Sequence, residues 1–316
     1  MLSRRYLRIK VFQALYAYWQ SDEASAARIE KELITSIDRT YDLYLALLLV
    51  FGELRHMAEL RMEERRNKRL PTPEDLSPNR RFVDDPVMRL VAHNERLRVE
   101  CEARKVSWVG HHELFSKLFR EVEASPAYKT FMADPDPSFK KSQTFFIQLF
   151  TEHVVNNEAV QDVFESRSIH WMEDLDLAAG LVKRLLEQLQ PGDRPAPDPG
   201  EFIRDRKEEH EFVTALYRRS IEWSPEHEAA IAGKASNWES DRINLSDMVL
   251  MQMALTEARA FDQIPVKVTL NEYIEIAKAY STPNSKNFIN GVLDKLFAEM
   301  RGDGRIHKVG RGLLET

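Results

Sequence analysis

The chain has 316 residues, 43% of them hydrophobic, so it can bury a sizeable core and form about two domains of ordinary size. Its formal charge of −6 excludes a general attraction to nucleic acid, and any such binding must use a local basic patch. A single cysteine excludes an intramolecular disulfide, and the longest apolar run, residues 43–51, is too short to cross a membrane, so we expect a cytoplasmic protein that does not contact membranes.

The predicted elements are all helical. Leucine, alanine, glutamate, lysine and arginine dominate, only 11 glycines occur, and strand-like alternation is scarce, which favours an all-α protein. The first helix is predicted over residues 3–20. At 100° per residue it has one core-facing stripe, with Arg4 and Arg8 at the edge of that stripe, while Arg5, Gln13 and Tyr16 point elsewhere.

This first helix also has the composition of a surface that binds RNA. Residues 4–10 contain four basic and no acidic side chains, and aromatic residues are interleaved with them and follow them. Guanidinium groups suit phosphates and aromatic faces suit unstacked bases, so the pattern fits single-stranded RNA. The alternative is a solvated amphipathic helix with ordinary buried aromatics. The aromatic residues concerned are Tyr6, Phe12, Tyr16 and Trp19.

The middle of the chain is predicted to be helical with two breaks. A long helix or helix pair spans residues 28–70, a proline-containing loop or linker covers 71–86, and helical periodicity returns over 87–124. Adjacent histidines, His111 and His112, point about 100° apart on a helix, so we expect surface side chains and no metal site there.

Residues 138–185 and 205–252 share a pattern: an aromatic and aliphatic helix, a polar break, a second helix, and then a tryptophan followed by acidic residues. The two tryptophans are Trp171 and Trp238, and the pattern raises the hypothesis of a duplication. Between them, the proline-rich stretch 190–200 is the best predicted domain boundary. We therefore expect an N-terminal helical region over residues 1–200 and a C-terminal helical bundle over 201–316.

The C-terminal stretch 262–296 carries the most specific pattern. Pro265 predicts a helix end before Ile264, and a new helix follows with its apolar residues, Tyr280 the last of them, on one face. Thr282 and Pro283 are predicted to be the N-cap and first residue of a final amphipathic helix.

This stretch resembles the C-terminal signature of the NusB family of transcription antitermination factors, and the N-terminus resembles the arginine-bearing first helix of that family. The resemblance implies a NusB fold of two packed three-helix bundles, built from residues 1–20 and about 205–300, with residues 21–200 as a large helical expansion. The matching residues are Arg4-Arg5, Gln13-Ala14-Leu15-Tyr16, Ile264-Pro265-Val266-Lys267-Val268, Asn271-Glu272, Ala277-Lys278, Ser285 and Phe288-Ile289-Asn290-Gly291-Val292-Leu293-Asp294-Lys295.

The resemblance also implies a function. NusB-family proteins bind the boxA element of ribosomal RNA transcripts together with a small ribosomal subunit protein, suppress premature termination, and reach RNA polymerase only indirectly. Arginines would contact phosphates, and Tyr16 and Phe288 would stack on bases, although burial of Phe288 in the core is an equal alternative. The RNA-binding candidates are Arg4, Arg5, Arg8, Gln13, Tyr16, Lys267, Asn284, Lys286 and Phe288.

We expect neither catalysis nor a cofactor. NusB-like domains also occur attached to ribosomal RNA methyltransferases, but the chain has no glycine-rich cofactor loop and no catalytic cysteine motif. A second alternative is a protein scaffold that keeps the fold and has lost RNA binding. The net negative charge and the thin basic patch favour this alternative.

Overall fold

The all-α prediction is confirmed: in the part of the chain that the structure describes, residues form helices, turns and loops without a β-strand. None of the described helices is long and apolar enough to span a membrane. The computed structural model describes residues 2–21, 25–192, 198–199, 206–235 and 243–314.

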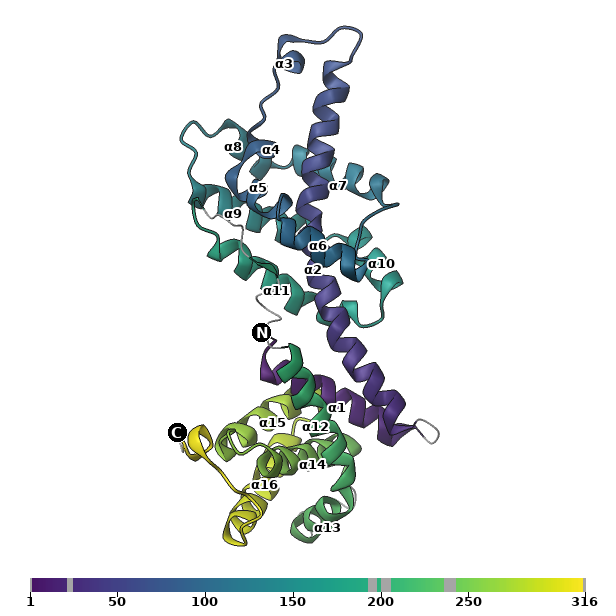
Figure 1. The fold of residues 1–316 in the computed structure, drawn as a ribbon, viewed down its shortest axis with the longest axis vertical. Helices are drawn as coiled ribbons and strands as arrows, with labels where there is room; N and C mark the ends of the chain where they lie inside the picture. Colours follow the sequence, from purple (N-terminus) through teal and green to yellow (C-terminus); the bar gives the residue numbers. More distant parts are fainter. Residues whose placement is uncertain (1, 22–24, 193–197, 200–205, 236–242, 315–316) are drawn as a thin grey trace. The chain divides into compact units, whose positions relative to one another are not determined.

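The chain forms two units by its internal contacts (Figure 1). Unit 1 comprises Met1–Ile37 and Asp205–Thr316, and unit 2 comprises Asp38–Arg204. The first helix, α1 (Arg4–Gln20), therefore packs with the C-terminal helices, which is the pairing that the resemblance implied. Helix α2 (Ala26–Arg66) begins in unit 1 and continues as the first helix of unit 2.

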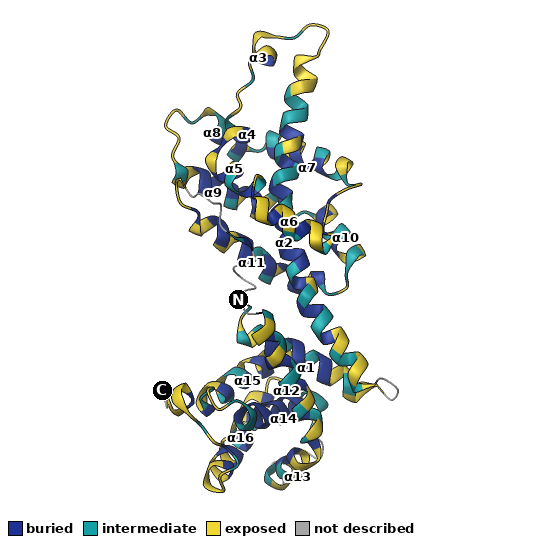
Figure 2. Cartoon of the chain, in the orientation of Figure 1, coloured by how far each residue is buried: buried dark blue, intermediate teal, exposed yellow. Residues whose placement is uncertain are grey.

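Unit 1 is organised around one buried helix, α14, in which the ten consecutive residues 249–258 are all buried (Figure 2). A helix that is buried on every side needs neighbours all round, and α14 contacts α1 and all the long C-terminal helices. These are α12 (Arg206–Glu222), α13 (Ser224–Ala235), α15 (Val266–Tyr280) and α16 (Ser285–Gly302), followed by the short 3₁₀ helix η3 (Gly310–Leu313).

Unit 2 has a core rich in phenylalanine, centred on Phe82, Phe145 and Phe146, whose rings contact one another and their neighbours. Aromatic rings bury a large area, and pairs of rings prefer edge-to-face or offset contacts. After α2 its elements are α3 (Pro73–Leu76), α4 (Arg81–Asp84), α5 (Pro86–Ala92), α6 (Glu95–Arg104), α7 (His112–Ala124), α8 (Pro126–Ala133), α9 (Phe139–Leu149), the π-helix η1 (Phe150–Val155), α10 (Glu158–Arg167) and α11 (Trp171–Gln188).

Two predictions about the middle of the chain need correction. The predicted loop over residues 71–86 contains the helical turns α3 and α4. Helix α3 starts at Pro73 because Thr72 forms a capping box with Asp75. The helical stretch 87–124 is three helices, because Asn94 caps a new helix and Lys105 ends it in a left-handed conformation. The hypothesis of a duplication depends on Trp238, which lies outside the described residues.

The helix boundaries near Pro265 are confirmed, but the predicted start of the last helix is wrong. Helix α14 ends at Ala260 and α15 begins at Val266, directly after Pro265. Helix α16 begins at Ser285 rather than Pro283, and its N-cap residue Asn284 makes no side-chain cap hydrogen bond. The hydroxyl of Thr282 contacts that of Ser285 instead of capping the helix.

A buried histidine between α13 and α14 predicts a pH dependence of stability. His227 is 1% exposed, and its Nε2 lies 3.0 Å from Nη1 of Arg259, so this nitrogen accepts a hydrogen bond and the ring is neutral. Its Nδ1 lies 3.5 Å from Oγ1 of Thr256, which donates to a backbone carbonyl and can accept from the ring. Burial lowers the pKa of His227 from 6.5 to about 4, and the charge of Arg259 adds to the effect.

We expect unit 1 to lose stability as the pH falls from about 6.5 to about 4. In that window the unfolded chain protonates His227 and the folded chain does not, which costs roughly 3 kcal/mol by pH 4. Urea denaturation at pH 7 and pH 4.5 measures the loss, and His227→Gln, which removes the titration, should make the loss smaller. An NMR titration of the His227 ring with a midpoint near pH 6.5 would contradict the prediction.

Candidate nucleic-acid interface

The arginine-bearing turn of α1 begins at Ser3, whose side chain accepts a hydrogen bond from the backbone N–H of Tyr6 and so caps the helix. Arg4, Arg5 and Arg8 follow in the first two turns. Since residues four apart lie on one face of a helix, Arg4 and Arg8 point the same way and Arg5 points about 100° further round. The three arginines therefore meet different neighbours.

Arg8 lies in the interior of unit 1, with a side chain that is 3% exposed. Its Nε and Nη2 donate to the two carboxylate oxygens of Glu257 at 2.7 and 2.8 Å, and Glu257 is fully buried. The same carboxylate accepts from the hydroxyls of Thr269 and Tyr273 at 2.8 and 3.2 Å. Burial opposes the charge of Arg8, but the Glu257 carboxylate outweighs it and raises the pKa of Arg8. This network fastens α1 to α14 and α15 and leaves Arg8 inaccessible to a phosphate in this structure.

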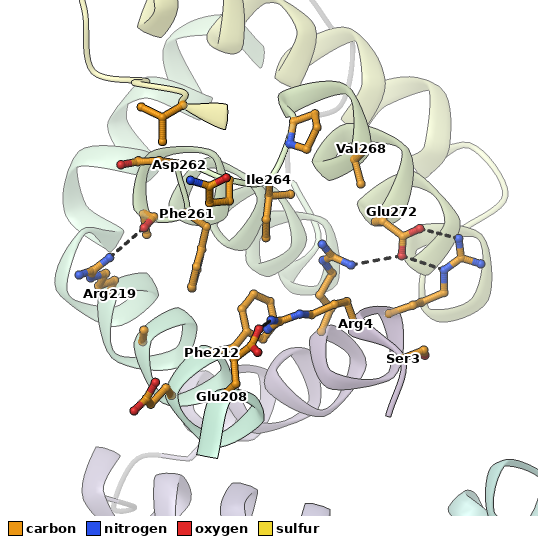
Figure 3. A pocket seen from close by; sticks show the side chains of 18 residues that line it. Ser3, Arg4, Glu208, Phe212, Arg219, Phe261, Asp262, Ile264, Val268 and Glu272 are labelled. Carbon is orange, nitrogen blue, oxygen red and sulfur yellow. Dashed lines mark hydrogen bonds and ion pairs between the residues drawn. The ribbon is translucent and has the colours of Figure 1, made fainter. Parts of the chain in front are cut away.

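Arg5 remains at the surface but is paired with a carboxylate of α15. Its side chain is 49% exposed, and its Nε and Nη2 donate to Glu272 at 2.9 and 2.8 Å (Figure 3). The hydrogen bond from Arg5 holds the pKa of the Glu272 carboxyl below its usual value. Nη1 of Arg8 also donates to Glu272, at 3.4 Å, so this carboxylate links the exposed arginine to the buried one.

Arg4 lies at the edge of a cleft with a volume of about 1070 Å³ that is formed by α1, α12 and the segment between α14 and α15 (Figure 3). Its guanidinium stands 4.4 Å above the ring of Phe212 and donates to Glu208. The three arginines thus face three carboxylates: Glu208, Glu257 and Glu272. In this structure the positive charge of the turn is compensated within the chain, which local sequence spacing did not indicate.

Further along α1, aromatic rings reach the surface. Arg5, Phe12 and Tyr16 lie within about 40° of one another around the helix. The ring of Phe12 is 4% exposed and packs 6.1 Å from that of Tyr16 and 5.6 Å from that of Tyr280 at the end of α15. Tyr16 and Tyr280 are 36% and 40% exposed, so two accessible rings flank a buried one. We call Phe12, Tyr16 and Tyr280 the aromatic strip.

Tyr280 is the candidate residue that sequence reasoning missed. Its spacing placed it on the buried face of α15, where Tyr273 and Ala277 are indeed buried. As the last residue of the helix, however, it extends past the core and contacts α1 instead. Its position immediately before the Ser-Thr-Pro-Asn turn was the available signal, because that turn marks the end of the helix.

The turn after Tyr280 is held by a buried carboxylate at the start of α14. Asp247 accepts hydrogen bonds from the hydroxyls of Ser281 and Ser285 at 2.5 and 2.8 Å. These contacts fix the turn that carries Asn284 and the start of α16, where Lys286 follows; both side chains are exposed. Phe288 follows one turn later, where it is half-buried and packs on the core of unit 1, so its side chain is neither fully buried nor fully exposed.

The remaining predicted residues are less closely grouped. Gln13 is half-buried on α1. Lys267 is exposed in the first turn of α15, about 20 Å along that helix from Tyr280 at 1.5 Å per residue, and lines a small hollow with Asp294 and Arg301. His111 is half-buried and His112 is exposed. No group of three or more metal-ligating side chains occurs within the described ranges.

Comparison with known proteins identifies a family and several relatives of this chain. Residues 181–298 match the model of the NusB family. The transcription antitermination protein NusB of Salinibacter ruber is 42% identical over 104 residues, which are 33% of this chain and 65% of that protein. The corresponding protein of Chloroherpeton thalassium is 38% identical over 117 residues, 37% of this chain and 55% of that protein.

A third relative is covered more completely. The transcription antitermination protein NusB of Geobacter sulfurreducens is 33% identical over 129 residues, which are 41% of this chain and 87% of that protein. The chain thus spans less than two thirds of the first two relatives and most of the third. No solved structure matches the chain.

Proposed function

Because the chain belongs to the NusB family, of which it is a long variant, we propose that it is a transcription antitermination factor that binds single-stranded RNA. Its target in this proposal is a boxA-type element of nascent ribosomal RNA. It acts there with a small ribosomal subunit protein and reaches RNA polymerase only through that complex. The role requires binding rather than catalysis, and it places the protein in the cytoplasm, where transcripts are made.

The observation that carries the proposal is the exposure of two rings beside the turn 281–284. Single-stranded RNA is recognised by stacking its splayed bases on aromatic faces and by hydrogen bonds to the edges of those bases. Tyr16 and Tyr280 offer such faces, and Asn284 offers an amide that can donate to and accept from a base edge. Lys286, which has no carboxylate partner within the described part of the chain, supplies charge for a phosphate.

Rigid support makes this surface suitable for recognition. Tyr16 and Tyr280 rest on the buried ring of Phe12, and Asp247 fixes the turn that follows. Side chains held in this way lose little conformational freedom on binding, which favours affinity. The NusB-like unit therefore presents a preformed set of stacking and hydrogen-bonding groups.

We expect tight and sequence-selective binding of boxA RNA. Fluorescence anisotropy with a boxA RNA and a scrambled RNA of equal length, at two salt concentrations, measures it with and without the ribosomal protein. The proposal is supported if the protein prefers boxA RNA and the ribosomal protein strengthens that preference. Equal and weak binding of both RNAs under all conditions would overturn it.

A second function, that of a protein scaffold without RNA binding, is favoured by one observation. The arginines of the first turn are matched by carboxylates within the chain, and the whole chain carries a charge of −6. A surface with so few uncompensated cations attracts polyanions weakly. Equal and weak binding in the anisotropy experiment would support this scaffold function.

A further inference from the structure

We propose that Glu272 is an autoinhibitory residue that keeps Arg5 from RNA phosphates, and that Glu208 does the same for Arg4. The inference rests on the proposed RNA binding by this face of α1. It assigns RNA recognition in the native chain to stacking and base contacts, with little contribution from the first-turn arginines. The two carboxylates thereby set the affinity for RNA below the value that the arginines alone would give.

The geometry of the Arg5–Glu272 pair supports this. The carboxylate accepts from two N–H groups of the same guanidinium, at 2.8 and 2.9 Å, which is the bidentate arrangement in which a phosphate would also bind. Glu272 is held in place by a further contact from the buried Arg8, so it does not swing away freely. A phosphate must therefore displace a positioned carboxylate or approach a guanidinium whose charge is already compensated.

Solvent exposure distinguishes the Arg4 and Arg5 pairs from the buried pair of Arg8 and Glu257. Arg4 and Arg5 have side chains that are 35% and 49% exposed, so RNA can reach them once the carboxylate charge is removed. Arg8 and Glu257 are 3% and 0% exposed and hold α1 in place, so they take no part in this competition. Exposed ion pairs contribute little to stability, so a mutation can break the Arg5–Glu272 pair without unfolding the protein.

The salt dependence of RNA affinity should reveal whether an arginine has been released from its carboxylate. Each cation that neutralises a phosphate of single-stranded RNA adds about 0.7 to the steepness of log K against log salt concentration. An arginine whose charge is already paired with a carboxylate adds little to this slope. Releasing one arginine should therefore steepen the slope by about 0.7 and raise the affinity about fivefold at 0.1 M salt.

The test is a double-mutant cycle with Glu272→Gln, Arg5→Ala and the combined variant, using labelled boxA RNA and a uridine oligonucleotide of equal length. Glutamine keeps a hydrogen-bond acceptor and removes the charge. We expect E272Q to bind both RNAs about fivefold more tightly at 0.1 M salt. R5A should change the affinity less than twofold, and R5A in the E272Q background should abolish the gain.

Glu211→Gln is the matched control, because Glu211 lines the same cleft but pairs with Lys207 rather than with an arginine of α1. An equal gain from E211Q would show a general charge effect and overturn the inference, as would a loss of affinity in R5A larger than the gain in E272Q. Unchanged melting temperatures confirm that α1 stays docked. Absence of boxA preference in the native protein would refute the proposed function, whereas lack of a gain in E272Q with the uridine oligonucleotide would refute this inference alone.

Discussion

Replacing Arg8 with alanine is expected to lower the free energy of unfolding of unit 1 by about 3–5 kcal/mol. The substitution leaves the carboxylate of Glu257 buried without the cation that compensates it, and Glu257 is 0% exposed. Removing one partner of a buried pair costs far more than the pair itself contributes, because the remaining charge has lost both its partner and its water. Urea denaturation followed by circular dichroism measures the change.

Arg5→Ala is the matched control for this prediction. Arg5 stands on the same helix and pairs with a carboxylate of α15, but its side chain is 49% exposed. Exposed pairs contribute about 0–1 kcal/mol, so R5A should be nearly as stable as the native chain. If R8A and R5A unfolded at the same urea concentration, the buried network could not be what fastens α1 to α14.

Sequence alone was sufficient for the elements whose signals are local. The apolar periodicity of residues 3–20 predicted α1, which runs from Arg4 to Gln20. Pro265 predicted the break between α14 and α15, because its ring fixes φ and removes a backbone donor at that residue. The all-helical class followed from composition in the same way.

The site depended on contacts that local patterns do not contain. Arg8 was placed at the edge of the core stripe, but its partner Glu257 is 249 residues away in sequence, and only the packing of α1 on α14 brings the two together. Thr282 had the spacing of an N-cap, yet its hydroxyl contacts that of Ser285, which donates a hydrogen bond to the buried carboxylate of Asp247. Long-range polar pairing of this kind overrides local propensity because an unpaired buried charge is so costly.

Folding changes the charge and the set of exposed rings on the face of α1 for which we propose RNA binding. Four basic residues and no acidic residue in the first turns predicted a phosphate-binding patch, whereas the folded chain adds carboxylates from three other helices. The same stretch of sequence also predicted an aromatic surface, and folding enlarges that surface. Tyr280 of α15 joins Tyr16, and both rings contact Phe12. The exposed rings of Tyr16 and Tyr280 are therefore the first residues to mutate.

Alanine substitutions of Tyr16 and Tyr280 are expected to weaken binding of boxA RNA by about 1–3 kcal/mol for each ring. Both side chains are more than one third exposed, so their truncation should cost the fold little. Fluorescence anisotropy measures the loss, and phenylalanine at the same two positions is the control, because it keeps the ring and removes only the hydroxyl. The double alanine variant distinguishes two geometries: losses that add indicate two separately stacked bases, and a double variant no weaker than either single variant indicates one base held against both rings. Native-like affinity in the double alanine variant would show that RNA, if bound, does not use the aromatic strip.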